Sequence, residues 1–271
     1  MKAPVILTAA IAAAVLAATA SGASRITPSI SSNWSGYAIS DPQTIAGQPV
    51  TAPISYTSIT ATWRQPKVTC TAGQASYSAF WVGLGGFTER SPGLEQIGTE
   101  ADCLRSGKAI YFAWYEMVPT PSVQLGITIR PGDTVTTSVN INGTDVLVQI
   151  KDRTRRTSFT RHLTVAHPDL ASAEWIAEAP SECGNSNNCD ILPLANFGSV
   201  AFTRIAAIGN AHPGTVTDPA WTSLPIALVP SGARHSARSA TASTAGAEPQ
   251  EVSSDGRTFT VGYVADASNL G

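Results

Sequence analysis

Hydrophobic and polar residues alternate along most of this chain, with the period of two that β-strands show when one face is buried. Ile59, Ala61 and Trp63, for example, alternate with two threonines. Turn signals separate such segments, and the strongest is Asn142-Gly143, a typical hairpin turn. The pattern predicts strands within residues 59–63, 123–129, 135–141, 146–150, 200–208 and 259–263.

Many short strands in close succession favour a sandwich or a barrel. Outside the apolar N-terminus the sequence has no convincing amphipathic helix. We therefore expect one all-β domain over residues 24–271, since about 250 residues is still a normal size for a single β domain. Residues 231–250 are rich in Ser, Ala, Thr and Gly, and we expect a flexible surface loop there. About 20 residues follow it, too few for a second domain.

The N-terminus has the plan of a secretory signal peptide. Lys2 is followed by an apolar run over residues 4–18 and then by small residues up to Ala23. A membrane anchor is the alternative, but the run is shorter than the ~20 residues that a spanning helix needs. We expect residues 1–23 to be removed after Ala20 or Ala23, giving a secreted protein that has no membrane attachment.

The four cysteines fit an exported protein. An even count in such a chain predicts two disulfides. Cys183 and Cys189 enclose a polar, turn-prone loop, so a local bridge is expected there, and Cys70 would then pair with Cys103. A metal site is the alternative, but the chain has no Cys-x-x-Cys spacing and its four histidines form no ligand motif.

Composition narrows the possible partners. Charged residues make up 13% of the chain and the formal net charge is −2. Nucleic acids and anionic membranes both favour a basic surface, so neither is expected as a partner. Nothing in the sequence calls for more than a monomer.

Familiar catalytic motifs are absent. The sequence has no Gly-x-Ser-x-Gly elbow, no His-Glu-x-x-His, no phosphate-binding glycine loop, and no Asp-Thr-Gly or Asp-Ser-Gly. Polar residues do interrupt apolar strand sequence in residues 80–98 and 173–178. Strand periodicity places Glu174 and Glu178 on one face. By spacing alone, the simplest interpretation is that both face solvent.

Six segments, taken in order, change this interpretation, because together they resemble the glutamic peptidases, also called eqolisins. A local cysteine pair follows the last segment, as it does in that family. The similar segments are Ser32–Gly36, Phe80–Gly86, Leu94–Gly98, Ala113–Glu116, Gly126–Ile129 and Ala173–Glu178. The resemblance implies a sandwich of two large antiparallel sheets, of the jelly-roll or concanavalin A-like type.

The resemblance also implies a catalytic pair and its surroundings. Gln96 matches the family's catalytic glutamine and Glu178 its catalytic glutamate. The family's peptidases are insensitive to pepstatin and use no metal or cofactor. Their substrates are proteins and peptides. By the same comparison we expect Trp34, Trp81, Trp114 and Glu116 near the substrate cleft, although core packing is the alternative for the tryptophans.

The pair suggests a division of the chemistry. Gln96 would stabilise the oxyanion and orient a water molecule, and Glu178 would carry out the proton transfers. A free glutamate titrates near pH ~4.3, so activity is expected in acid. Gly85 departs from the family, whose fungal members have an aspartate there near the site, and this bears on the acidity of the cleft.

Three rival functions stay open. A carbohydrate-binding module or lectin would also use tryptophans in a groove. A glycosidase would use two of Glu116, Glu174 and Glu178, and would have no need of Gln96. The third is a family member that has lost its activity.

Overall fold

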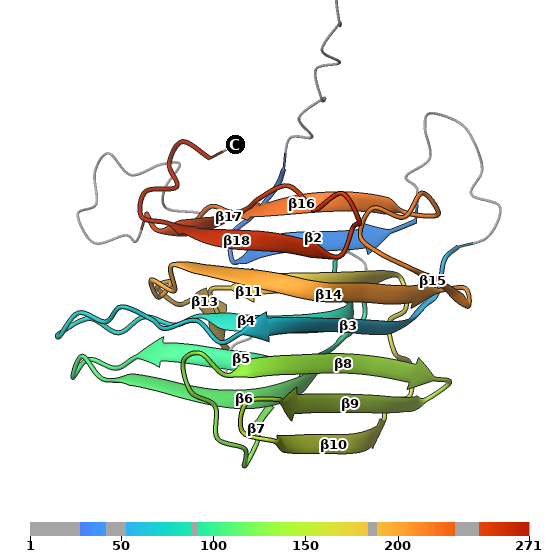
Figure 1. The fold of residues 1–271 in the computed structure, drawn as a ribbon, viewed down its shortest axis with the longest axis horizontal. Helices are drawn as coiled ribbons and strands as arrows, with labels where there is room; N and C mark the ends of the chain where they lie inside the picture. The colour runs from blue at the N-terminus through green and yellow to red at the C-terminus, as the bar shows by residue number, and fades with distance from the viewer. Residues whose placement is uncertain (1–27, 42–52, 88–90, 184–188, 231–243, 271) are drawn as a thin grey trace, which may run out of the picture.

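The computed structural model describes residues 28–41, 53–87, 91–183, 189–230 and 244–270, and within these ranges the chain contains strands and no helix. Sixteen of the described strands belong to one continuous sheet (Figure 1). Its first half runs β10 (Thr157–Thr164), β9 (Asp145–Asp152), β8 (Thr134–Asn142), β3 (Tyr56–Arg64), β14 (Ser199–Gly209), β18 (Thr258–Val264) and β17 (Gly246–Pro249). Its second half runs β16 (Thr222–Leu228), β2 (Trp34–Ser40), β11 (Ser172–Glu178), β4 (Ala79–Gly85), β5 (Leu94–Cys103), β6 (Ala109–Val118) and β7 (Thr120–Gln124).

Three pairings lie off this path. β1 (Ser29–Ser31) pairs with β16, in parallel, and β15 (His212–Gly214) pairs with β14. β12 (Ser181–Cys183) and β13 (Cys189–Ile191) form a separate antiparallel ribbon.

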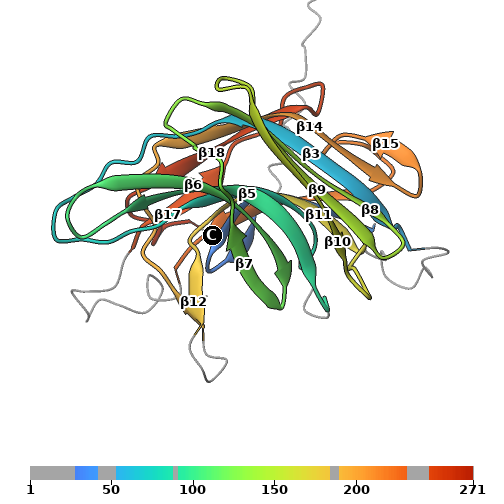
Figure 2. The ribbon, with the colours of Figure 1, turned by 90° about the horizontal axis from the view of Figure 1, so that it is seen from below.

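The sheet folds over on itself into two layers, so the expected all-β sandwich is confirmed. β3 contacts β4 and β11 across the interior, and β8 contacts β4 and β5. Figure 2 shows β3, β8 and β14 in one layer and β5 and β6 in the other. The two layers are halves of one sheet, because β16 and β17 remain paired where it bends. The sequence led us to expect two sheets, and the structure refines this, because the two layers belong to one continuous sheet.

Aromatic side chains fill the space between the layers. Trp63, Phe202 and Phe259 are buried there, and each ring contacts a neighbouring ring. A buried indole needs a hydrogen-bond acceptor, and two tryptophans of this core, Trp63 and Trp175, find one in the opposite layer. Trp63 Nε1 donates to Thr99 Oγ1 at 3.1 Å, and Trp175 Nε1 donates to the Thr60 carbonyl at 2.9 Å. These two bonds fix how the layers lie over each other.

The outer face of the second layer is buried as well. A separate apolar cluster forms on β2, β4, β5, β6, β11 and β16, with half-buried aromatic residues at its margin. Strands β4 and β11 are therefore covered on both faces, and every residue of β4 is buried. This explains why residues 79–85 and 172–178 lack alternation in the sequence. The cluster consists of Ala38, Ala79, Trp81, Leu94, Trp114, Ile176 and Ile226.

Two sequence-based boundaries were wrong. The strand expected over residues 123–129 ends at Gln124, and residues 125–130 form no strand. The loop expected over residues 231–250 includes strand β17, which pairs with β18. Ala247 of this strand is fully buried, and small residues suit such close packing. Alternation missed it because a four-residue strand of small residues has almost no hydrophobic pattern.

Other expectations fall outside the described residues. The signal peptide over residues 1–23 is among them, and so are residues 231–243 of the expected loop. In the part of the chain that the structure describes, no helix is long and apolar enough to cross a membrane.

The expected Cys70–Cys103 disulfide is confirmed, with Cα atoms 5.3 Å apart. It ties the segment after β3 to the end of β5. Cys189 is also disulfide-bonded, and strand pairing places Cys183 directly opposite it. The Cys183 side chain lies outside the described structure, so the second pairing stays a prediction.

The Cys70–Cys103 bond should stabilise the fold measurably. It closes a loop with a sequence separation of 33. Loop-closure entropy then predicts that the Cys70→Ala/Cys103→Ala variant loses about 3–4 kcal/mol of unfolding free energy. Urea unfolding of the variant and wild type under non-reducing conditions measures this. A loss below about 1 kcal/mol would show that the bond constrains the unfolded chain far less than loop closure implies.

Candidate active site

The outer face of the second layer presents its side chains in rows that cross the strands. Antiparallel pairing in register sets these rows, because residues on one face alternate along every strand. The first row is Trp34, Glu178, Ala79, Glu100 and Phe112. The second is Gly36, Ile176, Trp81, Gly98 and Trp114. The third is Ala38, Glu174, Gly83, Gln96 and Glu116.

Glu178 is therefore two rows away from Gln96, with Trp81 and Gly98 of the second row between them. Both side chains line one cavity of ≈ 750 Å³. Trp34, Trp114 and Glu116 line it too. The structure thus brings five of the six expected cleft residues together. The cavity wall also includes residues 91–94, 118–119 and 180–181.

Trp81, the sixth, has a different position. It is fully buried and lies beneath the cavity instead of lining it. Its indole Nε1 donates to Glu178 Oε2 at 2.7 Å. Trp81 therefore supports the carboxylate from below, and its burial matches core packing, the alternative that the sequence left open for the tryptophans.

Neutral N–H donors hold Glu178. Besides Trp81, Asn33 Nδ2 donates to Glu178 Oε1 at 2.9 Å. Burial raises the pKa of Glu178 to about 7, and the nearby Glu116 also raises it. Hydrogen bonds from Trp81, Trp34 and Asn33 lower this pKa, but they do not outweigh burial. The free site can therefore hold Glu178 in either protonation state near neutral pH.

Gln96 is fixed by a carboxylate on the next strand. Its Nε2 donates to Glu116 Oε2 at 2.7 Å, directly across the β5–β6 pair. Gln96 is 4% exposed, and its Oε1 has no hydrogen-bond partner among the described residues. Burial raises the pKa of Glu116, while hydrogen bonds from Gln96 and the Ser122 backbone lower it. Glu116 thus orients the Gln96 amide, whose second N–H is not used by this bond.

Two further acids lie on the same face of β5, and sequence reasoning missed both. Glu100 lines the cavity, and Asp102 is buried beside it. Burial raises the pKa of Glu100 to about 9, with Asp102, Glu178 and Glu116 adding to the effect. Burial also raises the pKa of Asp102 to about 7. Counting in twos from Gln96 would have placed both acids on this face.

A second group of acids is buried at the other end of β4. Glu174 is 0% exposed, and neither of its carboxyl oxygens has a hydrogen-bond partner of ordinary geometry among the described residues. Burial raises its pKa well above the usual range, and Asp169 and Glu95 raise it further, while Ser172 lowers it. Burial likewise raises the pKa of Glu95 to about 7. The interpretation that Glu174 faces solvent was therefore wrong.

Asp169 occupies the space above Gly85. A Cβ atom at Gly85 would collide with the Asp169 side chain, and the backbone there has a φ of 81°. By resemblance, Gly85 stands where fungal family members have an aspartate, and the sequence left the acidity of this region open. The structure places the Asp169 carboxyl group there, from a distant part of the sequence.

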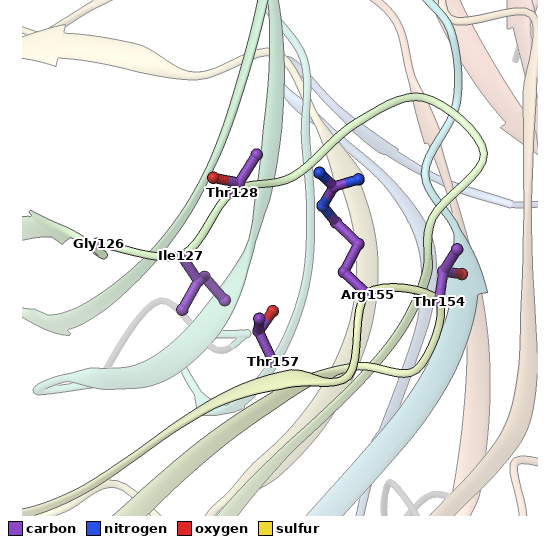
Figure 3. Close-up of a pocket in the computed structure, with 6 residues that line it drawn as sticks. All are labelled: Gly126, Ile127, Thr128, Thr154, Arg155 and Thr157. Carbon is purple, nitrogen blue, oxygen red and sulfur yellow. The ribbon is translucent and has the colours of Figure 1, made fainter.

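A separate hollow of ≈ 520 Å³ lies beside the β9–β10 turn (Figure 3). It is formed by residues 126–128, Thr154, Arg155 and Thr157. Arg155 Nε is 3.8 Å from Asp133 Oδ2, so its charge is already partly paired. The hollow has no acid, base or nucleophile arranged for catalysis. As for metals, the described residues contain no group of three or more His, Cys, Asp or Glu side chains placed to hold one.

Comparisons with known proteins agree with this geometry. A model of the peptidase A4 family matches residues 32–260. No curated protein sequence gave a significant match. Three solved structures, all described as glutamic or eqolisin peptidases, share the fold.

The first is scytalido-glutamic peptidase with a peptide-based transition-state analogue, at 21% identity and a TM-score of 0.64. The match covers 86% of this chain and 98% of that one. The second is SCP-B, an eqolisin in complex with the tripeptide Ala-Ile-His, at 20% identity, a TM-score of 0.61 and coverage of 86% and 98%. The third is aspergilloglutamic peptidase from Aspergillus niger, at 25% identity, a TM-score of 0.51 and coverage of 70% and 99%.

Glu174→Gln should make the protein more stable at neutral pH. The folded pKa of Glu174 lies above the unfolded value, so folding takes up a proton and stability falls as pH rises above about 4.5. The amide keeps the shape and cannot ionise. We expect a higher melting temperature than wild type at pH 7–8 and little difference at pH 4, measured by circular dichroism.

The exposed Glu248→Gln is the matched control for this measurement. It should leave the melting temperature unchanged at both pH values. If Glu174→Gln destabilises the protein at pH 8 as much as at pH 4, then the charge of the buried Glu174 does not destabilise the folded protein at pH 8.

Proposed function

The chain belongs to the peptidase A4 family, and from this premise we propose that it is an exported acid endopeptidase in which Gln96 and Glu178 activate water against peptide bonds. The family match agrees with the resemblance to glutamic peptidases found in the sequence. The observation that carries the proposal is that Gln96 and Glu178 line one cavity, each held by its own hydrogen-bond partner.

Glu178 is suited to move protons. As a carboxylate it accepts a proton from water while the water oxygen bonds to the scissile carbonyl carbon. The carbonyl electron pair moves to oxygen and forms the oxyanion. Glu178 then returns the proton to the amide nitrogen, the C–N bond breaks, and the amine leaves. Each proton that Glu178 accepts is given back, so one water is consumed for each peptide bond.

Gln96 is suited to stabilise the oxyanion. Its amide has no charge to titrate, and Glu116 accepts only one of its two N–H bonds. The other N–H donates to the oxyanion in our proposal. A donor that is already oriented requires no reorganisation during the reaction, which is the usual source of such stabilisation.

The cavity supports an extended peptide as substrate. Trp34 and Trp114 stand in neighbouring rows on opposite sides of the cavity, and Leu94, Val118 and Pro119 add apolar surface. No lysine, arginine or histidine is among the lining residues that the structure describes. Such a wall suits apolar or basic side chains beside the scissile bond.

Insensitivity to pepstatin follows from the proposed chemistry. Pepstatin acts on aspartic peptidases, whose two aspartates share one proton. Here the proton-transferring residue is a single glutamate partnered by an amide. Export is supported by the N-terminal sequence and by disulfide bonds, which persist in oxidising compartments.

The catalytic pair is tested by substitution. We expect Gln96→Ala to lower kcat about 10²–10³-fold, by analogy with the loss of an oxyanion donor. Glu178→Gln should lower activity at least as much, because it removes the proton acceptor. The measurement is cleavage of a denatured protein with and without pepstatin.

Matched controls for this test are Gln149→Ala on β9 and Glu248→Gln on β17, both remote from the cavity. Wild-type turnover in either folded active-site variant would reject the assignment. If wild type cleaves nothing at any pH, a glycan-binding screen would test the carbohydrate-binding alternative.

The pH dependence should differ from that of an isolated glutamate. The rising limb of kcat/KM reports the base in the free enzyme. Because burial raises the pKa of Glu178 to about 7, the midpoint of that limb should lie well above 4.5. Glu95 and Asp102 lose their protons near the same pH, which works against the folded state.

We therefore expect an optimum between mildly acid and neutral pH, where part of Glu178 has ionised and the fold still holds, above the pH of ~4.3 that the sequence alone suggested. A profile of kcat/KM from pH 3 to 9, run beside melting temperatures at each pH, measures both effects. A rising limb centred at or below 4.5 would contradict the desolvation of Glu178.

A further inference from the structure

Asn33 contacts both the proposed base and the residue that follows it. Its side-chain Nδ2 donates to Glu178 Oε1 at 2.9 Å. Its backbone carbonyl accepts the N–H of Ala179, the residue after Glu178, at 2.8 Å. The end of β11 is thus attached to the turn that precedes β2. Asn33 is also one of the residues that line the cavity.

Ser31 determines which end of the Asn33 amide faces Glu178. The Ser31 hydroxyl donates to Asn33 Oδ1 at 3.3 Å. It also accepts the backbone N–H groups of Asn33, at 3.3 Å, and Trp34, at 3.1 Å. Because Asn33 Oδ1 is used in this way, Nδ2 is the end left for the carboxylate. The amide is therefore oriented before any substrate arrives.

Strand β1 keeps Ser31 in place. It pairs in parallel with β16, and Ser31 lies opposite Leu228. The Ser31 carbonyl accepts the N–H of Val229 at 2.8 Å. Ser31 precedes residue 32, where the family-model match begins. A short strand outside the matched region therefore anchors Ser31, which orients the Asn33 amide that contacts the base.

Each carboxylate oxygen of Glu178 accepts a hydrogen bond from a neutral donor. Asn33 donates to Oε1 and Trp81 donates to Oε2. Two donors in different directions define the plane of the carboxylate. A carboxylate has about four lone-pair sites, so acceptor capacity remains for water.

We propose that Asn33 is a positioning residue, whose amide, oriented by Ser31, holds the Glu178 carboxylate in the plane from which it accepts a proton from water. This inference rests on the proposed function of Glu178. It adds the β1–β2 turn to the machinery of the site.

The test uses four variants in two matched pairs. Asn33→Ala and Ser31→Ala remove the proposed unit. Asn140→Ala and Ser58→Ala remove a similar pair on the other layer, where Ser58 Oγ donates to Asn140 Oδ1 at 2.7 Å. Each variant of the full-length protein is first checked for folding by its melting temperature.

The first readout is the pH profile of kcat/KM. The Asn33 hydrogen bond favours the ionised form of Glu178. Its loss should move the rising limb upward by about one pH unit. The groups facing Glu178 that also titrate are Glu116 and Glu100, and both remain in every variant. We expect kcat/KM below the limb to fall about 10–100-fold in Asn33→Ala and less in Ser31→Ala.

The second readout does not depend on catalysis. Nuclear magnetic resonance of protein labelled with ¹³C at glutamate carboxyl groups follows Glu178 directly, with Glu178→Gln identifying its signal. The Glu178 pKa should rise in Asn33→Ala and stay unchanged in Asn140→Ala. This titration still decides the inference if the protein proves to have no peptidase activity, so the two proposals fail separately.

Asn33→Asp provides a second variant of nearly unchanged shape. It places a second acid 2.9 Å from Glu178 in place of a donor, so activity should fall further than in Asn33→Ala. Acidification should restore part of that loss by protonating the new acid. The proposal is overturned if folded Asn33→Ala and Asn33→Asp keep the wild-type pH limb and the wild-type Glu178 titration.

Discussion

The active-site face depends on how closely β4 packs between β11 and β5. At Gly98 a Cβ atom would collide with the backbone of Phe80 and with Trp81. Residues with side chains are excluded there, because Phe80 and Trp81 already occupy the space that a Cβ atom would take. This close packing sets Trp81 between the rows of Glu178 and Gln96. A larger residue at Gly98 would push Trp81 and strand β4 aside and so displace the N–H that Trp81 donates to Glu178.

The second constraint is the desolvation of acids on a face that most sandwiches leave in water. Burial is the largest cause of the raised pKa of each of Glu100, Asp102, Glu116, Glu174 and Glu178. None of these groups forms a salt bridge with a described lysine, arginine or histidine. Neutral carboxyl groups are much less costly to bury than charged ones. The fold is therefore most compatible with solutions in which these groups hold their protons, which agrees with the proposed acid range.

The sequence predicted most of the fold, because strands with one buried face show clear alternation, as residues 135–150 do. It failed for Gly246–Pro249, which has no such pattern, and for residues 125–129, whose alternation continues past the end of β7. Gln96 and Glu178 came from resemblance, since no local signal separates a catalytic glutamate from a solvated one. Trp81 and Asn33 lie 97 and 145 positions from Glu178 in the sequence. The spacing of residues along the chain does not predict contacts over such separations.

Glu178 is held by an amide and an indole, although a salt bridge would bind it more strongly. The chemistry of the proposed reaction explains this choice. A lysine or arginine beside Glu178 would favour its charged form, and the proposed mechanism needs that group to give its proton back to the amine. A second charge would also add its own desolvation cost on this buried face. Asn33 and Trp81 fix the position of Glu178 without fixing its charge. Gln96 follows the same logic at the oxyanion, where a donor that never titrates keeps its function across the whole acid range.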